Sequence, residues 1–123
     1  MLFSVVSQTP TSEEMIKAWH VLTDPLVSKC ACASGAKLSD IRALGETFKY
    51  PNIPCLKCYA KCIYYKLGHI DYEGNLIEEN FLKDALGVTP AVAAMCKNKT
   101  NAILDLCEKM YEFDKCCASQ VIV

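Results

Sequence analysis

The segment Cys55-Leu56-Lys57-Cys58-Tyr59-Ala60-Lys61-Cys62 contains three of the nine cysteines of the chain. It follows Pro54, which suits the first position of a helix, and this helix is expected to run to Leu67 and to end at Gly68. Cysteines that are three and four residues apart lie on one face of a helix, so all three thiols point in one direction. The bonds that these thiols make therefore decide how the helix is held against the rest of the fold.

Three thiols on one helical face are compatible with a metal site or with disulfides to other helices. Zinc sites usually take their ligands from two short clusters, often with histidine nearby. The other six cysteines of this chain are instead spread over separate segments. A disulfide stabilises a small domain by about 2–4 kcal/mol when it closes a long loop. We therefore favour disulfides, and we expect neither a metal ion nor a cofactor.

Length and composition indicate one small secreted domain. The chain has 123 residues, of which 52% are hydrophobic, so it can bury a single core. Nine cysteines in so short a chain favour an oxidising, extracellular compartment. The net charge of −1 argues against nucleic acid as a partner, because phosphate binding needs a basic surplus. No apolar run in the sequence is long enough to span a membrane.

Both ends of the chain are expected to lie outside the helices. We assign residues 1–123 to one domain with an N-terminal extension at 1–10 and an apolar C-terminal tail at 118–123. Residues 1–6 are apolar but lack the basic flank and the length of a signal peptide, so Met1 is taken as a start residue or cloning remnant on a mature chain. The tail is expected either to fold back as a wall or lid of a cavity or to fray.

Capping residues, prolines and glycines divide the chain into six helices and no sheet. Thr11 and Glu14 form a capping box that starts the first helix, which Pro25 kinks. Thr89 caps the fifth helix, with Pro90 at its first position. The remaining helices are expected at 38–48, 54–67, 76–86 and 101–117.

Six of the cysteines follow an ordered spacing. They are Cys30, then 27 residues, Cys58, three residues, Cys62, then Cys96, ten residues, Cys107, eight residues and Cys116. This spacing, with the segment Lys66-Leu67-Gly68-His69-Ile70-Asp71 and the pair Gly74-Asn75, resembles the insect odorant-binding protein family. The resemblance covers residues 12–116. It implies an all-α, compact six-helix domain that is linked by disulfides and encloses an apolar cavity.

The resemblance also implies a disulfide pairing. The family joins its first cysteine to the third, the second to the fifth and the fourth to the sixth. In this chain the pairs are Cys30–Cys62, Cys58–Cys107 and Cys96–Cys116. Cys32, Cys55 and Cys117 lie outside the pattern, and we expect Cys32–Cys55 as an extra disulfide because the first pair brings their neighbours together. Cys117 is then expected either to be buried and inert or to link two chains as a homodimer.

The function implied by the resemblance is reversible binding and transport of small hydrophobic ligands, such as odorants or pheromones. The expected location is an aqueous extracellular fluid, such as a sensory fluid, with an odorant receptor as a further candidate partner. Apolar helix faces supply the candidate cavity wall, in which Tyr65 or Tyr111 would orient a ligand hydroxyl or carbonyl. The candidate ligand-binding residues are Met15, Trp19, Leu22, Tyr65, Phe81, Met95, Met110, Tyr111, Phe113, Ile122 and Val123.

The sequence contains no catalytic constellation. His20 and His69 lie on separate segments, no glycine-rich phosphate loop is present, and the cysteines are assigned to disulfides, so we expect no enzyme. His69 is expected either to be exposed to solvent or to charge between about pH 5 and 7 and loosen the cavity. The alternative function is a secreted disulfide-linked helical protein of salivary, venom or defence type that binds non-odour lipids or a protein partner.

Overall fold

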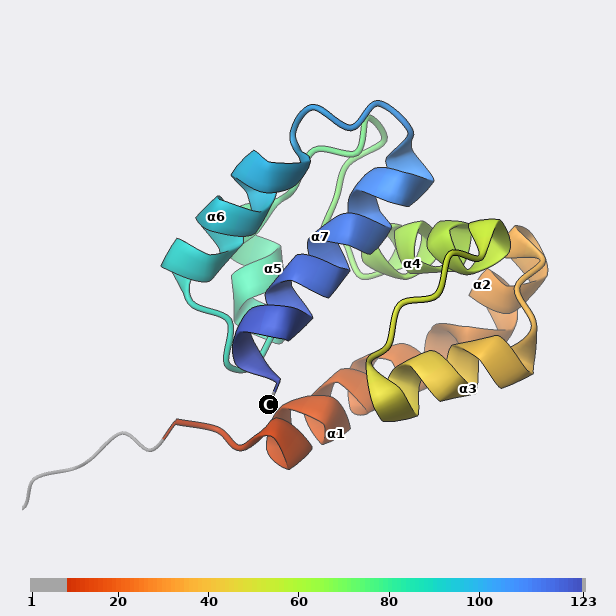
Figure 1. Cartoon of the computed structure of the whole chain (residues 1–123), viewed down its shortest axis with the longest axis horizontal. Coiled ribbons are helices and arrows are strands. Elements are labelled where there is room, and N and C mark those ends of the chain that lie inside the picture. Colours follow the sequence, from red (N-terminus) through yellow and green to blue (C-terminus); the bar gives the residue numbers. More distant parts are fainter. Residues whose placement is uncertain (1–8, 123) are drawn as a thin grey trace, which may run out of the picture.

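The computed structural model describes residues 9–122, and these residues form an all-α domain (Figure 1). The helices, in chain order, are α1 (Ser12–Thr23), the 3₁₀ turn η1 (Asp24–Leu26), α2 (Val27–Ser34), α3 (Leu38–Thr47), α4 (Pro54–Lys66), α5 (Glu78–Asp84), α6 (Pro90–Thr100) and α7 (Leu106–Val121). Within the described range the only β pairing is an isolated bridge between Ile70 and Leu76. Because α1, η1 and α2 form one kinked helical unit, the six expected helices are confirmed.

The local signals in the sequence place the first helical unit. The Thr11 hydroxyl accepts from the Glu14 amide at 3.1 Å, and the Glu14 carboxylate accepts from the Thr11 amide at 2.9 Å, so the capping box is confirmed. Pro25 lies in the short 3₁₀ turn between α1 and α2, where the expected kink occurs. Gly35 ends α2 with a φ of 75°, a left-handed conformation that glycine adopts without strain.

Two of the expected helices have different limits. α5 begins at Glu78 instead of Leu76, because the bridge of Leu76 to Ile70 holds the chain extended there. The last helix begins at Leu106 instead of Asn101, because the Asp105 carboxylate caps it by accepting from the Glu108 amide at 2.9 Å. That helix continues to Val121, so residues 118–121 are helical and the expected tail is reduced to its last residues. Residues 1–8 of the expected N-terminal extension lie outside the described range.

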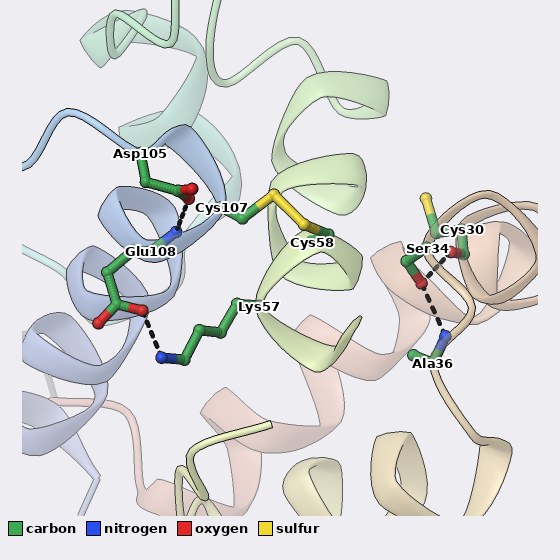
Figure 2. The surroundings of a disulfide bond; sticks show 8 residues. All are labelled: Cys30, Ser34, Ala36, Lys57, Cys58, Asp105, Cys107 and Glu108. Atoms are coloured by element: carbon green, nitrogen blue, oxygen red, sulfur yellow. Dashed lines mark hydrogen bonds and ion pairs between the residues drawn. A yellow bond between two sulfur atoms is a disulfide. The ribbon is translucent and has the colours of Figure 1, made fainter. Parts of the chain in front are cut away.

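Three disulfides connect the helices. They are Cys30–Cys62 between α2 and α4, Cys58–Cys107 between α4 and α7, and Cys96–Cys116 between α6 and α7. This is the pairing that the family resemblance implies. Figure 2 shows Cys58–Cys107 joining α4 to the first turn of α7. Since two of the three thiols of α4 are bonded to other helices, that helix is fixed between α2 and α7.

The expected fourth disulfide is wrong. Cys32 and Cys55 are both free and exposed. Cys32 lies two residues after Cys30 in α2, so the two side chains point to nearly opposite sides of the helix. Cys30 is fully buried and bonded to α4, whereas Cys32 is exposed to solvent. Cys117 is free and buried, as one of the two expectations had it, and burial raises the pKa of its thiol to about 12. A disulfide to a second chain through Cys117 does not fit this position.

α7 crosses the middle of the molecule, between α4 on one side and the pair α5 and α6 on the other (Figure 1). The buried side chains form two clusters that both contact Trp19. The first joins α5, α6 and α7 to the end of α4, and the second joins α2, α3 and α4. α1 and α3 also approach closely: the His20 ring bonds the Gly45 carbonyl oxygen at 3.0 Å, and a Cβ added at Gly45 would meet that ring.

Candidate ligand-binding cavity

A cavity with a volume of about 410 Å³ lies among the described residues. It lies between the kinked α1–α2 unit, α3, the connection that follows α3, and α4, with one residue of α7 at its wall. Small-molecule sites commonly have volumes of about 300–1,000 Å³. The lining residues are Trp19, His20, Thr23, Asp24, Val27, Leu38, Ile41, Arg42, Leu44, Gly45, Glu46, Phe48, Tyr50, Tyr59, Ala60, Ile63, Tyr64 and Asp114.

Aromatic rings form much of this wall. Trp19 comes from α1, Phe48 and Tyr50 from the connection after α3, and Tyr59 and Tyr64 from α4. Trp19 and Tyr64 contact each other with ring centroids 5.8 Å apart. Such rings offer a large apolar surface to a ligand, with the tyrosine hydroxyls as polar groups.

A half-buried carboxylate, that of Asp114, joins two of these tyrosines. The Tyr50 hydroxyl donates to one oxygen of Asp114 at 2.5 Å, and the Tyr64 hydroxyl donates to the other at 2.7 Å. Burial raises the pKa of Asp114, while the two tyrosine hydroxyls counteract this by bonding to the ionised form. Burial and the nearby Asp114 carboxylate raise the pKa values of Tyr50 and Tyr64 well above the usual value, so both hydroxyls remain protonated donors.

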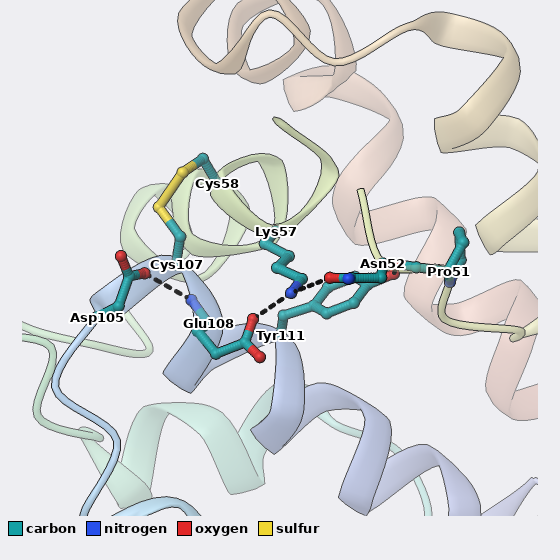
Figure 3. Close-up of polar contacts among 8 residues, drawn as sticks. All are labelled: Pro51, Asn52, Lys57, Cys58, Asp105, Cys107, Glu108 and Tyr111. Carbon is teal, nitrogen blue, oxygen red and sulfur yellow. Dashed lines mark hydrogen bonds and ion pairs between the residues drawn. A yellow bond between two sulfur atoms is a disulfide. The ribbon is translucent and has the colours of Figure 1, made fainter. Parts of the chain in front are cut away.

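Tyr111 holds the connection that carries Tyr50. Its hydroxyl donates to the Pro51 carbonyl oxygen at 2.7 Å, and its ring packs edge-on against Tyr50 at 5.2 Å between centroids. Lys57 lies over the Tyr111 ring and pairs with Glu108 on α7 (Figure 3). Tyr111 is thus not in the cavity wall, contrary to the prediction, but it fixes a residue that is.

A second, smaller cavity of about 50 Å³ lies beside the first. Trp19, Phe48, Tyr64 and Asp114 border both cavities. The rest of its lining includes the predicted residues Met15, Phe81 and Ile122, together with Ala85, Leu86, Val88, Cys117, Ala118 and Val121. The end of α7 and Ile122 therefore line this small cavity and not the main one, so the described part of the tail is not the expected wall or lid of the main cavity. Val123 lies outside the described range.

Of the predicted ligand-binding residues that the structure describes, Trp19 alone lines the main cavity. Tyr65 is exposed and packs on Tyr72, because one step along α4 turns its side chain away from the side that Tyr64 occupies. Met110 and Phe113 are buried in the first core cluster, against which Met95 packs. Leu22 is half-buried and lines neither cavity, since His20 and Thr23 occupy the cavity side of α1.

Sequence reasoning missed the wall contributed by α3, by its following connection and by Asp114. One signal could have found Asp114. It lies three residues after Tyr111 and three before Cys117, so a carboxylate falls on the buried face of α7. A charged group in such a position needs buried partners, and the two tyrosine hydroxyls supply them.

His69 is fully buried, so the expectation of a solvent-exposed residue is wrong. Its Nε2 atom lies 2.8 Å from an Asp84 carboxylate oxygen, and its Nδ1 atom has no hydrogen-bond partner among the described residues. The ring packs against Trp19, Tyr64 and Phe81. Burial is the main cause that lowers the pKa of His69, against the opposing effect of Asp84.

Stability is expected to fall as the pH drops below about 6.5, the unperturbed histidine pKa. The folded state holds the pKa of His69 below this value, so the unfolded chain binds more protons in the window between the two values. The free energy of unfolding in urea, measured from pH 7.5 to 5, should decline in the wild type. In His69→Gln the free energy of unfolding should decline less over this pH range. If the two proteins show the same decline, His69 is not its cause.

Within residues 9–122, no group of three or more side chains is placed to hold a metal ion, and no helix has the length and apolar character needed to cross a membrane. The fold and the cavity define a class: a small all-α protein whose disulfide-linked helices border a cavity of the size that small ligands occupy. The sequence model of the PBP/GOBP family matches residues 11–120. The chain therefore belongs to this family, the insect odorant- and pheromone-binding proteins, which bind and carry small hydrophobic ligands and are not enzymes. No curated protein and no solved structure matches the chain significantly.

Proposed function

We propose that this chain binds small hydrophobic ligands, odorants or pheromones among them, in the main cavity and carries them reversibly through extracellular fluid. The observation that carries the proposal is the largely aromatic wall of a cavity of about 410 Å³ in a member of a carrier family. The three disulfides suit an oxidising extracellular location. Delivery to an odorant receptor and the absence of enzymatic activity belong to the same proposal.

The binding energy comes mainly from transfer of apolar ligand surface out of water. A ligand that buries about 250–300 Å² gains on the order of 6–8 kcal/mol at about 25 cal/mol per Å². Losses of translational and side-chain freedom reduce this gain. Reversible binding with micromolar dissociation constants is therefore expected, which suits a carrier that must also release its ligand.

Filling the main cavity should abolish most of the binding. Ala60 lies on α4 in the cavity wall and is almost fully buried. In Ala60→Trp the indole occupies space that the ligand needs, so the dissociation constant of the neutral fluorescent probe N-phenyl-1-naphthylamine should rise at least about tenfold, about 1.4 kcal/mol. The matched control is Ala94→Trp, because Ala94 is exposed on α6 and away from the cavity.

Unchanged probe affinity in a folded Ala60→Trp protein would contradict this choice of site. A wild-type protein that does not bind the probe would remove the carrier function altogether. Displacement of the bound probe by a panel of volatiles and fatty acids then separates odorant transport from the alternative, a secreted carrier of non-odour lipids. If the Ala60→Trp protein, whose cavity is filled, still binds a protein partner, the result would favour the other alternative, a secreted helical protein that acts by binding another protein.

A further inference from the structure

Asp114 brings a negative charge to the wall of both cavities without a cation beside it. Among the described residues Lys57 pairs with Glu108, and the His69 ring contacts the Asp84 carboxylate, so neither contact includes Asp114. Its recorded partners are two neutral hydroxyls, those of Tyr50 and Tyr64. A charge with little access to water is stabilised most effectively by an opposite charge. Binding of a cationic group beside Asp114 is therefore favourable.

The carboxylate also has unused acceptor capacity. An ionised aspartate can accept about four hydrogen bonds, and each Asp114 oxygen accepts one from a tyrosine. Asp114 keeps part of its surface accessible although protein atoms enclose it. Because it borders both cavities, this accessible part faces the space in which a ligand would lie.

The rest of the wall fits a cation as well. Five aromatic rings surround the main cavity, those of Trp19, Phe48, Tyr50, Tyr59 and Tyr64. The faces of such rings attract ammonium groups, and desolvated contacts of this kind are the strongest. The other charged lining residues are Asp24, Glu46 and Arg42, so carboxylates outnumber cationic groups. His20 also lines the cavity, and its Nε2 atom bonds the Gly45 carbonyl oxygen.

We propose that the cavity prefers ligands that combine an apolar body with a protonated amine, whose ammonium group donates a hydrogen bond to Asp114 among the aromatic rings. This inference rests on the proposed carrier function and specifies the chemical class of ligand for the same cavity. Binding an ammonium group favours the ionised form of Asp114, whose burial otherwise raises its pKa. The competing explanation is that Asp114 serves only to hold Tyr50 and Tyr64 in place.

A matched ligand series separates the two explanations. The compounds 2-phenylethylamine, 2-phenylethanol, propylbenzene and 3-phenylpropanoate share an apolar body and end in an ammonium, hydroxyl, methyl or carboxylate group. Their dissociation constants are measured at pH 7 by displacement of N-phenyl-1-naphthylamine. In the wild type the amine should bind about tenfold more tightly than the alcohol, and the carboxylate should bind most weakly.

The variant Asp114→Asn keeps the size of the side chain and removes its charge. It should weaken binding of the amine by about 10–100-fold, the range for a hydrogen bond to a charged group, and change binding of the alcohol and of propylbenzene by less than about threefold. A purely structural role instead predicts an equal loss for all four compounds. The variant Tyr50→Phe keeps the carboxylate and frees one of its oxygens, so the preference for the amine should be kept or increased.

Three results overturn the inference. The first is an amine that binds no more tightly than the alcohol in a wild type that binds the probe, which leaves the carrier function intact. The second is an equal loss for all compounds in a folded Asp114→Asn protein. The third is a Tyr50→Phe protein that loses the preference for the amine, which decides the matter even if Asp114→Asn does not fold. Absence of probe binding by the wild type would instead end the carrier function and this inference together.

Discussion

Replacing Cys58 and Cys107 together by alanine is expected to lower the free energy of unfolding by about 4 kcal/mol. The disulfide spans a sequence separation of 49 residues, the longest of the three, so its loss releases the largest loop in the unfolded chain. It joins α4 to α7, the two helices with the most extensive mutual packing. The change is measured by urea unfolding at neutral pH, under conditions that leave the other two disulfides intact.

Two further variants test whether loop length explains the effect. Replacing Cys96 and Cys116 by alanine opens a separation of 20 residues and should cost about 3 kcal/mol in the same model. Cys32→Ser removes an exposed free thiol and should change the free energy of unfolding by less than about 0.5 kcal/mol. A Cys58 and Cys107 variant as stable as Cys32→Ser would show that this disulfide does not hold the fold.

This disulfide also matters for the cavity. α4 supplies Tyr59, Ala60 and Tyr64 to the wall, and α7 supplies Asp114. The Lys57–Glu108 ion pair adds a contact in the same region, although a partly exposed pair contributes less than about 1 kcal/mol (Figure 3). Cys58–Cys107 therefore adds a covalent constraint to the packing and the Tyr64–Asp114 hydrogen bond that place Asp114 in the wall, and its loss should weaken ligand binding as well as stability.

The helices were predictable from sequence where the signal is local. Three such signals are the capping box at Thr11, the proline at 25 and the glycine at 35. Each of them acts on the backbone within a few residues, so the local sequence is enough to predict where the helix begins, kinks or ends. The last helix was misplaced because the spacing of apolar residues continues across the turn before it, and the capping role of Asp105 was overlooked. The order of the cysteines predicted the disulfide pairing only because the chain resembles a family whose pairing is known.

The cavity wall could not be predicted in the same way. An apolar stripe shows that a helix face is buried but not whether it meets another helix or an empty space. Met110 and Phe113 fulfil the helical pattern and lie in the first core cluster, while Phe48 and Tyr50 lie on a connection outside any helix and line the main cavity. The distinction depends on how helices far apart in the sequence are placed relative to one another.

Phe81→Ala tests this distinction and is expected to lower the free energy of unfolding by about 3–5 kcal/mol. Phe81 is 1% exposed, and its ring contacts Tyr64, His69 and Phe113 with centroids 5.9, 5.5 and 5.2 Å away. Neighbouring rings cannot fill the space that it leaves without losing these contacts. The exposed Tyr72 provides the matched control, because Tyr72→Ala removes a ring at the surface and should cost less than about 0.5 kcal/mol.

The same variant distinguishes a core residue from a ligand contact. Phe81 borders only the small cavity, so the loss of its ring enlarges that space and leaves the wall of the main cavity in place. At a temperature where Phe81→Ala remains folded, its dissociation constant for N-phenyl-1-naphthylamine should stay within about threefold of wild type, about 0.7 kcal/mol. A large loss of affinity together with a small loss of stability would instead support the sequence-based prediction that Phe81 contacts the ligand. The stability of Phe81→Ala therefore reports on the core, and its affinity reports on which cavity the ligand occupies.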